Sequence, residues 1–159
     1  MIEADVLEVS VHIAAEPETV FPYFTDPVRY VQWMGEHATL EPEPGGVYRV
    51  SMRDGVEVLG EFVEVDPPRR LVFTWGWTQD QAVAPGTTRV VVTFTAEDGG
   101  TRVLLRHHDL PDDAQRSHHG QGWEMYLARL GVRVSGGDPG PDPNATGTTT
   151  LPPTSSGPN

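Results

Sequence analysis

The spacing of hydrophobic residues predicts a sheet of six strands. Residues 6–13 alternate between apolar and polar types, which is typical of a strand with one buried face. Further segments rich in β-branched and aromatic residues are separated by turns that contain Gly, Pro or Asp. They cover residues 47–52, 56–65, 70–77, 88–96 and 101–108. Because short turns join most of these segments, neighbouring strands should pair as hairpins in one antiparallel sheet.

Two short helices are expected between the first and the second of these strands. Pro17 fits the first position of a helix, where a missing backbone N–H is tolerated, and Pro22 limits how far that helix continues. A second short helix begins near Pro27 and carries Tyr30 and Trp33. Together they form a helical insertion after the first strand.

Residues 112–134 show the repeat of a long amphipathic helix. Asp112 and Asp113 suit its first turn, because carboxylates are favoured near a helix N-terminus. The apolar residues fall three or four positions apart and form one stripe. They are Trp123, Tyr126, Leu127, Leu130 and Val134. This stripe has to be buried against the sheet, so the sequence predicts an α+β fold in which an antiparallel sheet holds a long C-terminal helix.

The composition changes at residue 135. Residues 135–159 consist mostly of Gly, Pro, Ser and Thr and contain one Leu. Such a segment cannot bury enough apolar surface to offset the loss of chain entropy. We therefore expect one folded domain over residues 1–134 and a disordered tail over residues 135–159.

Charge and composition argue against several classes of function. The chain has 23 acidic and 11 basic residues, and the resulting net charge of −12 disfavours nucleic acids and anionic membranes as partners. It contains no cysteine, which suits a reducing compartment. It also lacks an apolar run long enough to span a membrane and the pattern of a signal peptide. We expect a cytoplasmic protein.

Several short motifs follow one another in a characteristic order. They are residues 13–15, 17–21 and Trp33, then GGVY at 45–48, GEFVEVDPPRRL at 60–71, 72–75, GTRV at 100–103, His107, 122–123, Leu127 and Leu130. In this order they resemble the START-like (SRPBCC, helix-grip) superfamily, and within it the branch of heat-shock-protein ATPase activator homologues (Aha-type). The resemblance implies a curved sheet wrapped around the C-terminal helix, with a cavity between them. Members mostly bind small ligands or lipids; some are cyclases, some sequester a toxic metabolite, and the eukaryotic namesakes stimulate a chaperone ATPase.

Inward-facing aromatic residues form the candidate ligand site. The proposed lining consists of Trp33, Tyr48, Phe73, Trp75, Trp77, His107, Trp123 and Tyr126. Two interpretations are open: the rings fill the core, or they line a pocket of roughly 300–1,000 Å³. The second interpretation predicts a non-catalytic protein that binds a hydrophobic or aromatic small molecule, such as a lipid or a polyketide, between the sheet and the helix.

His107 leaves further alternatives open. As the inward polar residue of the last strand it could anchor a ligand, or act as acid or base in an enzyme of the cyclase or aromatase type. It could equally be a buried histidine whose hydrogen bonds are satisfied. A third alternative is a protein-interaction module similar to the chaperone activators.

We expect neither a metal nor a cofactor, and we assign no catalytic residue. The pairs His107–His108 and His118–His119 cannot converge on one ion. Adjacent residues of a strand point to opposite faces, and adjacent residues of a helix lie about 100° apart. The serines lack the G-x-S-x-G setting of a hydrolase nucleophile.

Overall fold

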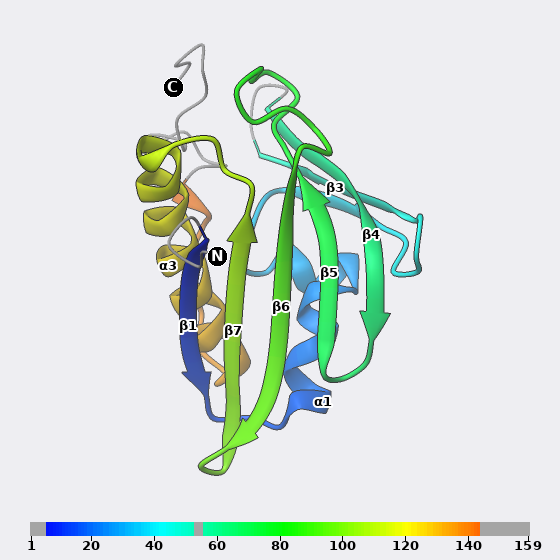
Figure 1. Cartoon of the computed structure of the whole chain (residues 1–159). Helices are drawn as coiled ribbons and strands as arrows, with labels where there is room; N and C mark the ends of the chain where they lie inside the picture. The colour runs from blue at the N-terminus through cyan, green and yellow to red at the C-terminus, as the bar shows by residue number, and fades with distance from the viewer. Residues whose placement is uncertain (1–5, 53–55, 144–159) are drawn as a thin grey trace.

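A computed structural model describes residues 6–52 and 56–143. Its centre is a seven-stranded antiparallel sheet in the order β1-β7-β6-β5-β4-β3-β2 (Figure 1). The strands are β1 (Leu7–Ile13), β2 (His37–Leu40), β3 (Val47–Ser51), β4 (Glu57–Asp66), β5 (Arg70–Trp75), β6 (Thr88–Glu97) and β7 (Gly100–His108). The helices are α1 (Pro17–Val20), the 3-10 helix η2 (Phe21–Phe24), α2 (Pro27–Tyr30) and α3 (Asp113–Val134).

The α+β class, the antiparallel sheet and the C-terminal helix are confirmed, whereas the expected number of six strands is wrong. The additional strand is β2, which pairs with β3 so that Leu40 lies opposite Tyr48. It has four residues, and only Leu40 among them is buried. So short a segment with one buried position carries no alternation that could identify it. The strand expected over 70–77 also ends earlier, at Trp75, and Trp77 forms an isolated bridge with Val58.

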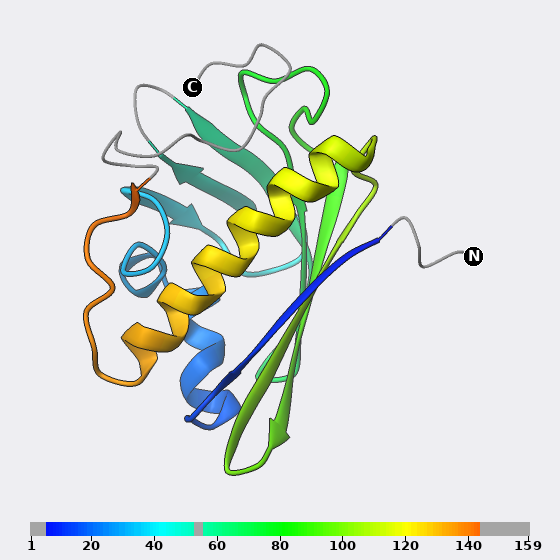
Figure 2. The same cartoon turned by 90° about the vertical axis from the view of Figure 1, so that its left-hand side faces the viewer.

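The sheet and the helices form two layers. Figure 1 looks onto the outer face of the sheet, and Figure 2 shows α3 crossing the inner face, with the short helices on the same side. A register shift between Phe62 and Glu64 places an extra residue in β4. Bulges of this kind bend a strand and increase its twist. The inner face therefore curves around α3.

The stripe of α3 accounts for much of the contact between the two layers. Trp123, Tyr126, Leu127 and Leu130 are each at most 4% exposed, as the helical spacing predicts. Inward residues of β6 and β7 are fully buried as well. They include Val90, Val92, Val103 and Leu105.

Asp112 caps α3, and removing its side chain is expected to cost about 1 kcal/mol of stability. Its carboxylate accepts a hydrogen bond from the backbone N–H of Gln115 at 2.8 Å. Asp112→Ala should lower the free energy of unfolding, as measured by urea denaturation. Asp113→Ala is the matched control, because the Asp113 side chain is 99% exposed and forms an ion pair with Arg116 at the surface. An equal loss in both variants would contradict the assignment of the cap.

The last described residues pack against the domain. We call residues 136–143 the strap; it turns back from the end of α3 toward the segment between α2 and β2 (Figure 2). The sequence predicts disorder from residue 135, but Asp142 is only 6% exposed and accepts hydrogen bonds from the Gly35 N–H at 2.6 Å and the Tyr126 hydroxyl at 2.9 Å. Residues 144–159 of the expected tail lie outside the described residues.

Arg129 holds the strap from the helix side. Its guanidinium donates hydrogen bonds to the carbonyl oxygens of Pro139, Gly140 and Pro141 at 2.9–3.2 Å. It also donates to the carbonyl oxygen of Trp33 at 3.0 Å. The strap is thus fixed by polar contacts, which explains why hydrophobic composition does not reveal it.

Candidate functional site

Five of the eight predicted site residues meet between the sheet and α3. The Trp75 ring is central: its centroid lies 4.9 Å from that of Trp123, 5.6 Å from that of Trp77 and 5.7 Å from that of His107. Tyr126 belongs to the same lining, three residues after Trp123 on α3. Alternation along β5 and β7 and helical spacing along α3 direct these side chains toward one another.

The other three predicted residues form a second aromatic cluster. Tyr48 stacks on Phe73 with centroids 4.2 Å apart, and Trp33 contacts Tyr30 at 4.9 Å. The Tyr30 and Tyr48 hydroxyl groups are hydrogen-bonded to each other. Trp33 donates its indole N–H to the Tyr23 carbonyl, so its polar group is used within the core. These three side chains therefore pack within the hydrophobic core and stabilise the domain next to the first group of site residues.

The expected cavity is reduced to a small hollow in this structure. Its volume is about 10 Å³, which is enough for about one water molecule. The lining consists of Met52, Trp75, Trp77, His119, Gly122, Trp123 and Tyr126. The aromatic side chains pack on one another in edge-to-face and tilted pairs and fill the space that periodicity alone leaves undefined.

His107 is a buried histidine with both ring nitrogens occupied. The Thr88 hydroxyl donates to the Trp75 carbonyl at 2.7 Å, so it accepts from Nε2–H of His107 at 2.9 Å. Nδ1 accepts from the Trp123 indole at 3.1 Å. Burial, reinforced by the nearby His119 and His108, holds the pKa of His107 well below its usual value. The ring is neutral at pH 7, and neither nitrogen is free for a substrate.

His119 is a lining residue that the sequence analysis does not select. Its Nε2 accepts from the Trp77 indole at 3.1 Å, so Nδ1 carries the proton that bonds to the Gln115 carbonyl at 2.9 Å. Burial lowers the pKa of His119 to about 4, although the bond to Gln115 and the charge of Asp80 act in the opposite direction. His119 lies four residues before Trp123 and so extends the helical stripe by one turn. This spacing is the sequence signal that could have identified it as a lining residue.

The indole N–H of Trp75 differs from those of the other three tryptophans in its hydrogen bonding. Its Nε1 is buried and has no hydrogen-bond partner among residues 6–52 and 56–143. Trp33, Trp77 and Trp123 each donate to an acceptor, as buried indoles usually do. A buried donor without an acceptor costs about 1–3 kcal/mol.

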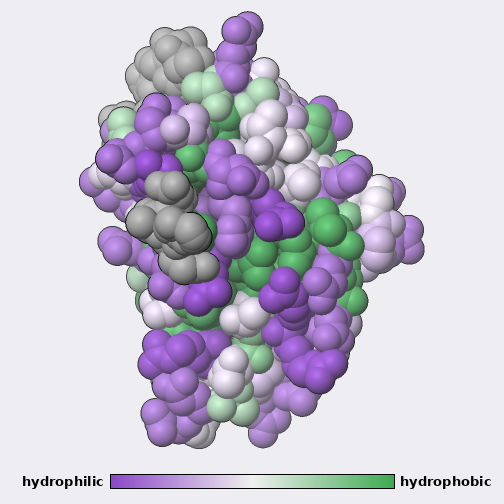
Figure 3. All heavy atoms as spheres, viewed as in Figure 1, coloured by the Kyte–Doolittle hydropathy of each residue, from purple (hydrophilic) through white to green (hydrophobic). Residues whose placement is uncertain are grey.

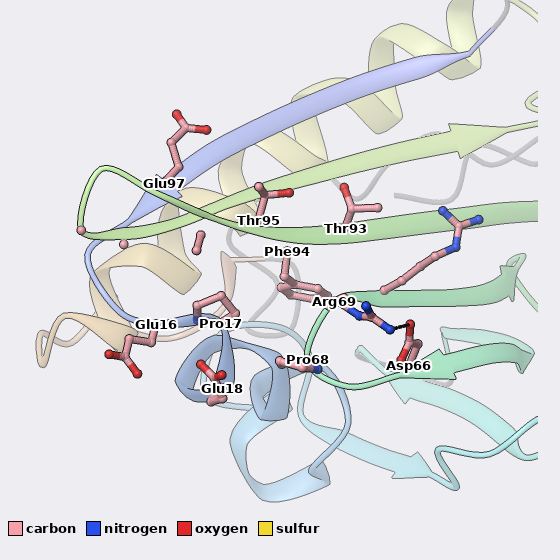
Figure 4. A pocket seen from close by; sticks show the side chains of 14 residues that line it. Glu16, Pro17, Glu18, Asp66, Pro68, Arg69, Thr93, Phe94, Thr95 and Glu97 are labelled. Carbon is pink, nitrogen blue, oxygen red and sulfur yellow. Dashed lines mark hydrogen bonds and ion pairs between the residues drawn. The ribbon is translucent and has the colours of Figure 1, made fainter.

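A groove of about 1050 Å³ lies at the opposite end of the sheet (Figure 4). It runs between α1, the β4–β5 turn and the β6–β7 hairpin, with buried Phe94 among its lining residues. Its charged groups are at the surface, and Arg69 is paired with Asp66 at 2.9 Å. The groove therefore offers no buried polar group of its lining residues to orient a ligand.

The outer face of the sheet carries a small apolar area within a hydrophilic surround (Figure 3). The outward positions of β5, β6 and β7 include Val72, Val91 and Leu104. Arginines on the same face pair with acids, for example Arg106 with Glu8 at 3.1 Å. Across the described part of the chain, no cluster of His, Asp and Glu suits a metal ion, and no helix could cross a membrane.

Comparison with known proteins relates the chain to one family. Residues 14–135 match the family model described as activator of Hsp90 ATPase homolog 1-like protein. A search of curated proteins gives no match. The solution structure of an AHSA1-like protein from Rhizobium etli is 41% identical, covers 87% of this chain and 86% of its own, and has a TM-score of 0.68.

Two further structures extend this comparison. DynU16, a protein of the dynemicin biosynthetic locus, is 26% identical over 85% of this chain with a TM-score of 0.74. The match covers 49% of DynU16, so the chain spans about half the length of that relative. An HSP90 activator from Plasmodium falciparum is 22% identical and has a TM-score of 0.69. The match covers 83% of this chain and 97% of the activator, and it shows that the two proteins share a fold.

Proposed function

Since the chain belongs to the family of activator of Hsp90 ATPase homolog 1-like proteins, a branch of the START-like superfamily, we propose that it binds an apolar aromatic small molecule between the sheet and α3. The observation that carries the proposal is the hollow where aromatic rings from β5 and α3 converge. The structural neighbour DynU16 comes from the dynemicin biosynthetic locus, and this origin is compatible with the binding of small molecules by this fold.

Binding requires the hollow to open. A volume of about 10 Å³ does not accommodate an aromatic ring, since benzene occupies cavities of about 150 Å³. Met52 lines the hollow with a flexible side chain, and Gly120 and Gly122 lower the helix propensity of α3 beside it. These residues provide a route by which the rings can separate.

The energetic balance favours a weak affinity. Burying roughly 200 Å² of apolar ligand surface would contribute about 5 kcal/mol. Separating the packed rings and immobilising the ligand consume part of this gain. We therefore expect dissociation constants of about a millimolar for small two-ring probes.

The geometry favours this function over the two alternatives. A cyclase that used His107 would need a free ring nitrogen, but Thr88 and Trp123 occupy both. An interaction module would present a large exposed apolar patch. The exposed large hydrophobics of the described residues are Val28, Val63 and Val132, on α2, β4 and α3.

Titration with indane, a two-ring hydrocarbon, tests the proposal by NMR. Indane should shift the indole signals of Trp75, Trp77 and Trp123, and Gly122→Leu should weaken its binding at least tenfold by placing an apolar side chain at the hollow. Gly131→Ala is the matched control: it also replaces a glycine of α3, but a Cβ there would make an ordinary van der Waals contact with Ile13 Cγ1 at 3.8 Å. If saturating indane leaves the three indole signals unchanged, the proposed function is wrong.

A further inference from the structure

The unpaired indole N–H of Trp75 is informative about the ligand. Trp75 is 3% exposed and lines the hollow, and its Nε1 has no acceptor within the described ranges. The neighbouring Trp77 and Trp123 donate to His119 and His107 at 3.1 Å, so the two adjacent imidazoles are already used. The remaining donor can be satisfied by an oxygen atom that enters the hollow.

The charges around the hollow restrict what can carry that oxygen. Its lining residues bear no formal charge while His119 is neutral. Two buried carboxylates act on lining residues: that of Asp142 accepts a hydrogen bond from the Tyr126 hydroxyl, and the charge of Asp80 acts on His119. An anionic ligand would therefore be buried among lining residues that supply no cation, with two carboxylates acting on the same lining, and this is strongly unfavourable.

We propose that the site selects a neutral aromatic ligand with one hydrogen-bond acceptor oxygen, such as a ketone, and that Trp75 Nε1–H donates to this oxygen. This inference rests on the proposed function, because it requires that the hollow opens for a ligand. Trp75 is thus a specificity-determining residue, and the packed rings around it supply affinity without regard to the oxygen.

Three probes of similar shape test the inference: indane, 1-indanone and indane-1-carboxylate. Their dissociation constants are measured by NMR at pH 7 for the natural chain and for Trp75→Phe, which removes the N–H and keeps an aromatic ring. We expect the substitution to weaken 1-indanone binding about fivefold more than indane binding, the effect of one hydrogen bond. The carboxylate should bind at least tenfold more weakly than the ketone.

The natural chain provides a readout that does not depend on the variant. The Trp75 indole proton signal, assigned by its loss in Trp75→Phe, should lie further downfield with bound 1-indanone than with bound indane, because only the ketone accepts a hydrogen bond from it. Equal weakening of both probes, or a carboxylate that binds as tightly as the ketone, would overturn the inference and leave the proposed function standing. If indane and 1-indanone both fail to perturb the lining residues, both conclusions fall together.

Discussion

Replacing Arg129 with methionine is expected to lower the free energy of unfolding by about 3 kcal/mol. Arg129 is 9% exposed and donates to four backbone carbonyl groups, one in Trp33 and three in the strap. Methionine keeps the apolar stem but leaves these carbonyls without their donor, so the strap should detach from α3. Urea denaturation at pH 7 measures the loss.

Arg133→Met is the matched control for this prediction. Arg133 lies one helical turn further along α3 and also contacts the strap, through an ion pair with Asp138 at 3.3 Å. The Asp138 side chain is 79% exposed, so this pair should contribute less than about 1 kcal/mol. Hydrogen exchange at Gly35, which donates to Asp142, should accelerate in Arg129→Met. Similar losses of stability in both variants would contradict a specific role for Arg129.

Acidification from pH 7 to pH 4 is expected to remove about 3 kcal/mol of stability through His119 alone. The pKa of His119 is about 4 in the folded protein, whereas a histidine in an unfolded chain has its usual value of 6.5. Above pH 6.5 both states are neutral and the stability is unaffected. As the pH falls below 6.5 the unfolded chain binds the proton first, so unfolding becomes more favourable until the pH reaches about 4. His107, whose pKa is also lowered, acts in the same direction.

The free energy of unfolding measured between pH 7 and pH 4 tests this prediction. His119→Gln should flatten the dependence, because glutamine does not titrate and its amide can still interact with Trp77. His118→Gln is the control: His118 is exposed and adjacent in sequence, and its charge is the smallest of the causes that act on the pKa of His119, so its replacement should change the slope much less. A slope that is the same in His119→Gln as in the natural chain would show that His119 does not couple folding to protonation.

The parts of the fold that sequence analysis identified have repeating patterns. The stripe of α3 and the alternation in β1 and β7 follow from burial of one face, and the structure has both elements. β2 has no such repeat, because three of its four residues are not buried. The strap is held by a buried arginine and a buried aspartate, and these contacts appear only when the segments that supply their partners are placed together.

Periodicity likewise located part of the candidate site and left its shape undetermined. It directed Trp75, His107 and Trp123 inward, and the structure brings them together. Whether inward rings enclose a space depends on their rotamers and on distances of a few ångström between elements. The hydrogen bonds that fix His107, and the lack of one at the Trp75 indole among the described residues, also arise from three-dimensional placement.

The order of strands in the sheet sets the sequence of events in which the chain can fold. Strands β2 to β7 are neighbours both along the chain and across the sheet, so each can pair with its predecessor as soon as it is made. β1 is the exception: Leu7 lies opposite His107 and Ile13 opposite Thr101. β1 can therefore pair only after β7 has been made. This pairing closes the long loop between β1 and β7, and together with the docking of α3 it completes the domain.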